Sequence, residues 1–206
     1  ETERNSPQML KAYTWRMKYR ETLTPDSFYV SLKGLEQWAE TTDKPMDRAV
    51  LNSLIAGIYA DYASSNRWQI RQRTNIVDEA PSSDIREWSS NMFVQQVMKY
   101  TAGSLQDTGL LLNTSSRIYI PFVKLGDTSE YYHHDMLHLL GSRGVDALNN
   151  VMGLDKDSVV QTSVENVYLG MLDAYEKAGM DDGYVLCKLD YLNWKRNSDP
   201  TFVPYR

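Results

Sequence analysis

Apolar residues recur at helical spacing along most of this chain, and this period restricts the folds open to it. One set falls at positions i, i+3, i+4, i+7, i+8 and i+11, and so lies on one face of a single helix. Its members are Leu51, Leu54, Ile55, Ile58, Tyr59 and Tyr62. The same spacing recurs in Val164, Val167, Tyr168, Met171, Leu172 and Tyr175. Two further stripes are Phe28, Leu32, Leu35, Trp38 and Ala39, and Ile85, Trp88, Met92, Phe93 and Val97. Because strand-like alternation is nearly absent, the pattern predicts an all-α fold.

Proline and glycine mark the expected ends of these helices. Three prolines are expected at the first position of a helix: Pro7, Pro25 and Pro45. The expected capping residues before them are Ser6, Thr24 and Asp43. Asp84 or Ser83 is the expected cap of a helix running through Trp88. Glycines expected where helices stop or reverse are Gly103, Gly126, Gly153, Gly179 and Gly183. This punctuation predicts about seven helices.

Two segments interrupt the helical period. Residues 76–83 contain Pro81 and are interpreted as a reversing loop, whereas residues 106–128 form a long connection with little periodicity. A connection of that length is either packed irregular structure or a sub-boundary. Within it, Ile118–Val123 is apolar enough to lie across the helices as a short extended segment. Residues 1–206 are interpreted as a single helical domain.

Helices with one apolar stripe each favour antiparallel hairpins that stack in a solenoid-like array, as in an irregular tetratricopeptide-like fold. No 34-residue self-similarity with the tetratricopeptide pattern occurs. Aromatic residues make up 11% of the chain. We expect their rings to bridge neighbouring helix pairs while their polar tips reach water or backbone carbonyls.

Composition narrows the class of partner. The net charge of −5 argues against a nucleic-acid-binding surface, because attraction to phosphate needs clustered, unbalanced Lys and Arg. No apolar run approaches the length of a membrane span, and no secretory signal pattern is present. We interpret the sequence as a fragment of a larger chain from which a signal peptide and further sequence have been removed.

The stretch from Tyr59 to Thr74 runs a helix directly into a turn rich in Arg and Trp. Its conspicuous members are Tyr59, Tyr62, Asn66, Arg67, Trp68 and Arg73. This run resembles a segment in the N-terminal helical region of the very large alpha-2-macroglobulin-like surface proteins of Bacteroidetes. Three further stretches are similar to helices of that region: Pro7–Tyr19, Leu139–Leu148 with Arg143, and Tyr184–Leu192.

The resemblance implies a protein of the periplasm, outer membrane or cell surface, secreted with a signal peptide, in a context of protease inhibition or envelope defence. It also implies that the partners are other domains of the same large chain or another protein. The shared motifs consist of aromatic and Arg positions and contain no catalytic group. A structural role therefore follows for Tyr59, Tyr62, Asn66, Arg67, Trp68, Arg73 and Arg143.

Two interpretations of the Arg- and Trp-rich turn compete. In the structural one, Trp68 and Ile70 anchor the turn in the core, while Arg67 and Arg71 pair with acids such as Asp61, Asp78 or Glu79. In the other, Trp68 with Arg67 and Arg71 forms an exposed stacking patch for a ligand or RNA. We favour the structural interpretation, which predicts a largely buried Trp68 ring.

All three histidines lie in one short stretch, His133, His134 and His138. His134 and His138 have the i, i+4 spacing that lets two imidazoles on one helix face share a metal ion. No third ligand is fixed by spacing; the available acids are Glu130, Asp146 and Asp155. Two imidazoles alone hold a divalent ion weakly, so we expect no bound metal.

The remaining reactive groups favour packing over chemistry. Cys187 lies in the middle of an expected helix. A macroglobulin thioester needs a Cys in a Gly-Glu context with a Gln three residues later, and the sequence around Cys187 lacks both. We therefore expect Cys187 to be buried and to serve packing. The acidic pairs Asp181-Asp182 and Asp155/Asp157 are interpreted as acids at helix starts. No cofactor motif occurs.

The sequence therefore predicts a non-catalytic helical scaffold or protein-interaction module of a large alpha-2-macroglobulin-like protein. Two alternatives stay open. One is a metal-dependent hydrolase built on the cluster from His133 to His138. The other is a free-standing SusD-like or tetratricopeptide-like binding module, favoured by the Trp and Tyr content.

Overall fold

The computed structural model describes residues 6–24, 28–73, 82, 84–119, 135–199 and 201–202. Seven longer helices account for most of these residues: α1 (Ser6–Leu23), α2 (Phe28–Thr41), α3 (Pro45–Ser65), α5 (Ser90–Ser104), α7 (Met136–Asn150), α8 (Asp157–Ala178) and α9 (Asp181–Ser198). Two short helices, α4 (Arg67–Arg71) and α6 (Thr108–Leu112), and two 3-10 turns, η2 (Ile85–Glu87) and η3 (Ser116–Tyr119), complete them. Within the described ranges the only β-pairing is an isolated bridge between Ser115 and Asp135. The prediction of an all-α fold is confirmed for this part of the chain.

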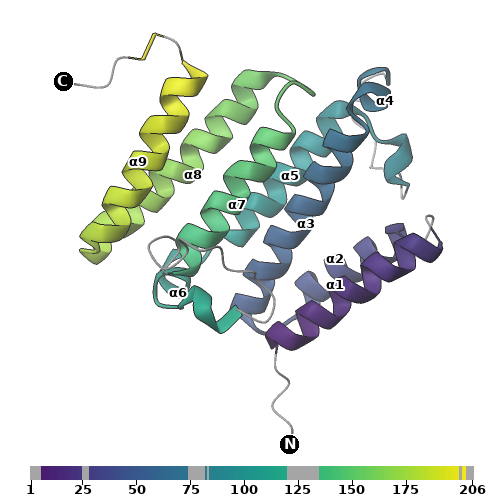
Figure 1. Cartoon of the computed structure of the whole chain (residues 1–206), viewed down its shortest axis with the longest axis horizontal. Coiled ribbons are helices and arrows are strands. Elements are labelled where there is room, and N and C mark those ends of the chain that lie inside the picture. The colour runs from purple at the N-terminus through teal and green to yellow at the C-terminus, as the bar shows by residue number, and fades with distance from the viewer. Residues whose placement is uncertain are drawn as a thin grey trace, which may run out of the picture.

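Helix α3 packs against three other helices: α2, α5 and α7. From α7 the contacts continue to α8, and from α8 to α9, while α1 lies on α2. Figure 1 shows the result, with α1 and α2 at one side of the molecule and α9 at the other. Helices α3 and α7 are separated in the sequence by about half the length of the described chain. Their contact therefore joins the N-terminal helices to the C-terminal ones.

The predicted stripes supply part of the core, which also contains Leu10 of α1 and Leu137 and Leu148 of α7. Leu51, Ile55 and Tyr59 of α3 are buried, as are Val164 and Tyr175 of α8. Phe93 of α5 is fully buried and forms ring contacts with Tyr62 and Trp88. The side chain of Phe28, which opens the predicted α2 stripe, lies outside the described residues. Burial of apolar side chains supplies the main driving force for the arrangement.

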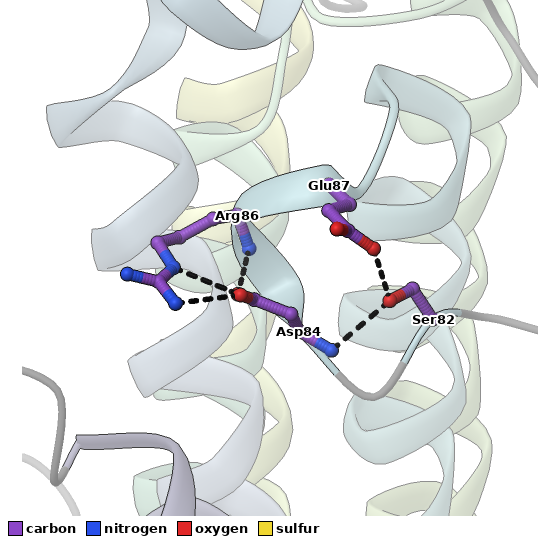
Figure 2. Close-up of polar contacts among 4 residues, drawn as sticks. All are labelled: Ser82, Asp84, Arg86 and Glu87. Carbon is purple, nitrogen blue, oxygen red and sulfur yellow. Dashed lines mark hydrogen bonds and ion pairs between the residues drawn. The ribbon is translucent and has the colours of Figure 1, made fainter.

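The stripe from Ile85 to Val97 is not one helix, contrary to the prediction. The backbone turns through η2, becomes extended at Trp88 and Ser89, and re-enters a helix at Ser90. Figure 2 shows the polar contacts of this turn. The Asp84 carboxylate accepts hydrogen bonds from the backbone N–H of Arg86 and from the Arg86 guanidinium. Asp84 is thus a cap, as predicted, but of the 3-10 turn. The side chains of the stripe still reach one core because the turn keeps Ile85 and Trp88 buried.

Glycines mark helix ends at two of the five predicted positions. Gly179 ends α8 with φ 64°, and Gly153, after α7, has φ 79°; both angles favour glycine. Gly103 and Gly183 instead lie within α5 and α9, and Gly126 lies outside the described residues. Gly183 serves close packing: a Cβ there would lie 2.4 Å from Cε1 of the buried Tyr175.

The described part of the long connection, residues 106–119, is packed structure. It contains α6 and η3, and its Leu111 and Tyr119 are buried. Ile118 is exposed, and Ile118 and Tyr119 lie in η3, so the predicted extended segment is wrong at its start; residues 120–123 lie outside the described residues. None of the described helices combines the length and apolar character needed to cross a membrane.

Two glycines of the last helix pair allow a matched test of this packing. Gly183→Ala should lower the free energy of unfolding by about 1–3 kcal/mol, because the added methyl meets the Tyr175 ring. Gly170→Ala on α8 should raise it by up to about 1 kcal/mol, because no atom lies within 4 Å of the added Cβ and alanine favours a helix. Denaturant unfolding of both variants measures these changes, and equal effects would show that α8 and α9 do not approach closely at Gly183.

Candidate functional site

The junction between α3 and α4 is built by the sequence motif from Tyr59 to Arg73. Helix α3 stops at Asn66, whose backbone departs from helical angles with φ −111° and ψ 19°. The Asn66 side-chain amide donates to the Tyr62 carbonyl at 2.9 Å. Asparagine side chains compete with the helix backbone in this way, so Asn66 provides a local reason for the break.

Arg67 connects this junction to the end of α7. Its guanidinium donates one hydrogen bond to the Met152 carbonyl and a second, of 2.8 Å, to the Asn150 carbonyl. The last carbonyls of a helix have no partner within the helix and carry its negative dipole end, so a cation is favourable there. The predicted pairing of Arg67 with acids is therefore wrong for the described residues. Asp61 instead accepts a hydrogen bond from the Asn150 amide, and Asp78 and Glu79 lie outside the described residues.

The second half of the motif holds the start of α5. Arg73 donates to the Trp88 carbonyl at 2.8 Å. The Trp88 ring stacks on Tyr59 with 5.2 Å between centroids, and its indole N–H donates to the Ser82 carbonyl at 2.7 Å. Arg73, Tyr59 and Trp88 thereby fix the extended backbone between η2 and α5.

Trp68 does not anchor the junction, contrary to the prediction. Its side chain is 73% exposed, whereas Ile70 is fully buried. The reason is the break at Asn66, which restarts the helix phase: in α4 the inward face is taken by Ile70, and Arg67 reaches α7. Of the two anchors that the structural interpretation predicts, Ile70 is therefore confirmed and Trp68 is wrong.

Arg143 lies on α7, where its Nε–H donates to the Ser53 hydroxyl of α3 at 3.2 Å. Arg71 is exposed in α4. Arg67, Arg73 and Arg143 thus direct their side chains to other parts of the fold, as do the rings of Tyr59 and Tyr62, whereas the Asn66 amide bonds the end of its own helix.

A buried polar cluster surrounds the start of α7. Asp135 caps α7 by accepting the His138 backbone N–H at 2.8 Å, and the Tyr175 hydroxyl donates to its two carboxylate oxygens at 2.9 Å each. The ring of His138, the second metal candidate, is buried, and its Nε2 lies 3.2 Å from the Asp190 carboxylate of α9. The other candidate, His134, lies outside the described residues together with His133. Among the described residues no three His, Cys, Asp or Glu side chains are grouped to hold a metal, and the prediction of no bound metal stays a prediction.

Cys187 of α9 is fully buried beside this cluster, 3.9 Å from the Tyr168 carbonyl. Burial raises the pKa of its thiol to about 12, and the nearby Asp190 and Asp135 carboxylates act in the same direction. A thiol with such a pKa is protonated at neutral pH and is a poor nucleophile. The structure thus places Cys187 in the packing role that the sequence predicts.

A second polar cluster escaped the sequence analysis. Oε1 of Glu36 in α2 accepts the hydroxyl of Tyr59 at 2.7 Å and that of Tyr100 at 2.8 Å. The two rings stack with centroids 5.9 Å apart, and the cluster borders a cavity of about 360 Å³. The inward position of Tyr59 was predictable from the helical stripe of α3, but Tyr100 of α5 lies outside the predicted stripes, and the Glu36 partner required knowledge of how α2 packs.

The carboxylates of these two clusters hold tyrosine hydroxyls. The carboxylates of Glu36 and Asp135 each face tyrosine hydroxyls, and burial, followed by interactions with these carboxylates, raises the pKa of Tyr59, Tyr100 and Tyr175. The tyrosines therefore act as neutral hydrogen-bond donors. Within the described residues we find no nucleophile held by a general base, the arrangement that covalent catalysis requires.

Comparisons with protein-family models, curated proteins and solved structures found no match to this chain.

The buried tyrosines predict a loss of stability in alkali. Their pKa values are raised above the value of about 10 for an exposed tyrosine, so above that pH only the unfolded chain ionises. Their stabilising contribution is complete below pH 10 and is lost as the pH rises, by up to roughly 1.4 kcal/mol per pH unit for each tyrosine. Denaturant unfolding across this range measures the slope, and Tyr175→Phe should reduce it. A free energy of unfolding that does not fall above pH 10 would contradict the assignment.

Proposed function

We propose that this chain is a non-catalytic helical scaffold with a protein-contact surface. The observation that carries the proposal is the outer face of α9. Cys187 is the buried residue of this helix, which packs on α8, yet Val185 and Leu189 on its other side are 55% and 54% exposed. These two side chains are one turn apart and thus form a contiguous apolar surface suited to another protein segment.

The use of polar side chains inside the fold also supports a scaffold. Arg67, Arg73 and Glu36 hold helices together, and the buried carboxylate of Asp135 caps a helix. These residues supply rigidity to a stack of helices. In this proposal the helices form antiparallel hairpins in a solenoid-like array, with α1 and α9 as its outer members.

The wider context rests on the sequence resemblance. We propose that the partner is another part of the same large alpha-2-macroglobulin-like chain, in the periplasm or at the surface of a Bacteroidetes cell. The scaffold would then position the domains that trap proteases or defend the envelope. The hydrolase alternative draws less support, because His138 is buried and faces Asp190.

The test uses the remainder of the polypeptide encoded by the same gene as the binding partner. The double variant Val185→Asp with Leu189→Asp should weaken binding at least tenfold in a calorimetric titration, because charges would have to be desolvated at the contact. Its midpoint of unfolding should stay near that of the parent chain, since both side chains are exposed.

Val30→Asp in α2 is the matched control, because Val30 is 64% exposed and lies at the other side of the molecule. It should bind as the parent chain does. The scaffold proposal fails if the remainder of the chain does not bind, or if both variants lose binding equally. Turnover of ester, peptide or phosphate substrates that is lost in His138→Ala would favour the hydrolase instead.

A further inference from the structure

Helix α1 is apolar on two opposite faces, and only one of them serves the core. Leu10 and Met17, two turns apart, are buried on the side where α1 lies on α2. On the outer side Trp15 and Tyr19 are 49% and 63% exposed. A helix of a globular protein ordinarily turns its apolar stripe inward and its polar residues outward. The outer apolar face of α1 has no role in packing the described part of the chain.

The outer face of α1 carries a continuous stripe. Its members follow one another at i, i+3, i+7 and i+11, the spacing that places side chains along one side of a helix. They are Ala12, Trp15, Tyr19 and Leu23, all exposed, and together they are called the α1 stripe below. The rings of Trp15 and Tyr19 stack with 5.8 Å between centroids, so they form one aromatic surface at the centre of the stripe.

Basic residues flank the α1 stripe on both sides. At about 100° per residue, one flank consists of Lys11 and Lys18, and the other of Arg16 and Arg20. Helix α1 contains these four basic residues and one acid, Glu21, so it carries a charge of +3. The whole chain carries −5, so the residues outside α1 carry −8. Helix α1 is therefore a positively charged element of an acidic protein.

An open groove of about 380 Å³ lies beside the α1 stripe, where α1 meets α2. Arg16 lines it together with Met9, Ala12, Tyr13 and Trp38. The Arg16 guanidinium lies over the Tyr13 ring, with its central carbon 4.8 Å from the ring centroid. An apolar groove beside a guanidinium suits a molecule that joins an apolar chain to an anionic phosphate, as a phospholipid does.

The stripe, its basic flanks and the groove together favour an anionic lipid surface as the partner. Helices that lie in the plane of a membrane bury Trp and Leu side chains below the headgroups, while Lys and Arg beside them reach anionic headgroups. A nucleic acid would pair with the cations and the rings but would leave Met9 and Leu23 without an apolar partner. We propose that α1 docks the molecule onto the surface of a membrane that contains anionic phospholipids.

The place of α1 in the fold leaves its outer face accessible to a membrane. Helix α1 lies at one side of the molecule, whereas α9 lies at the other (Figure 1). The acidic remainder of the chain is repelled by anionic headgroups, which turns α1 toward them. Membrane docking by α1 does not depend on the protein contact proposed for α9, and either can fail without the other.

The test is cosedimentation of the whole chain with lipid vesicles. We expect binding to mixed vesicles of phosphatidylcholine and phosphatidylglycerol, much weaker binding to pure phosphatidylcholine, and a loss of binding as salt screens the cations. Lys11→Gln with Arg20→Gln, one from each flank, should weaken binding roughly 25-fold, because each basic residue near an anionic surface contributes about fivefold. Trp15→Gln with Tyr19→Gln should weaken it by roughly tenfold or more, because two apolar rings no longer leave water.

Lys156→Gln with Arg196→Gln is the matched control, since it removes the same charge from one exposed Lys and one exposed Arg outside α1, and it should bind as the parent chain does. The unfolding midpoints of all three double variants should stay near that of the parent, because the substituted side chains are exposed. The proposal is overturned if anionic vesicles are not bound, if neutral vesicles are bound equally well, or if either α1 variant binds unchanged. It is also overturned if the control variant loses as much binding as the α1 variants. Binding to single-stranded DNA or to the remainder of the polypeptide that the α1 variants lose, without binding to vesicles, would assign the stripe to one of those partners and would overturn it too.

Discussion

The packing of α3 against α2, α5 and α7 is the constraint on which the rest of the structure depends. This helix buries Leu51, Ile55 and Tyr59, and the apolar surface they remove from water is worth roughly 1.5–3 kcal/mol for each large side chain. Its neighbours come from both halves of the described sequence. The surface of α3 therefore determines where these helices lie relative to one another. α8 and α9 then extend the row from α7, and α1 extends it from α2 (Figure 1).

Burial of that core removes helix ends and polar groups from water, so they lose hydrogen bonds to solvent. Specific side chains replace these hydrogen bonds. Arg67 supplies donors to carbonyls after α7, Asp135 supplies an acceptor to the start of α7, and Glu36 accepts two tyrosine hydroxyls. The pairings of Arg67 and Glu36 join segments distant in sequence, so they also specify which helices are neighbours. Thr101 is the exception in the described chain, because its buried hydroxyl has no hydrogen-bond partner.

Periodicity was a good guide to helices and to inward faces, because both depend on residues within a few turns of one another. It predicted burial in the stripes of α3 and α8. The interpretation of the Arg- and Trp-rich turn as a structural anchor was right for Ile70 but wrong for Trp68, because α3 ends at Asn66 and the short α4 turns Ile70 inward. The 3-10 turn before α5 was also missed, since the apolar spacing of Ile85 and Trp88 continues through it. The partners of Arg67 and Glu36 depend on tertiary packing that no local pattern contains.

The central claim is that the Tyr59–Arg73 motif is a structural junction held by Arg67 and not by the Trp68 ring. Denaturant unfolding of Arg67→Ala and Trp68→Ala compares the two side chains directly. The account predicts a loss of about 2 kcal/mol for Arg67→Ala, which leaves two helix-end carbonyls without their charged donor. For Trp68→Ala, which truncates an exposed ring, it predicts a change within about 0.5 kcal/mol. A larger loss for Trp68→Ala than for Arg67→Ala would contradict it.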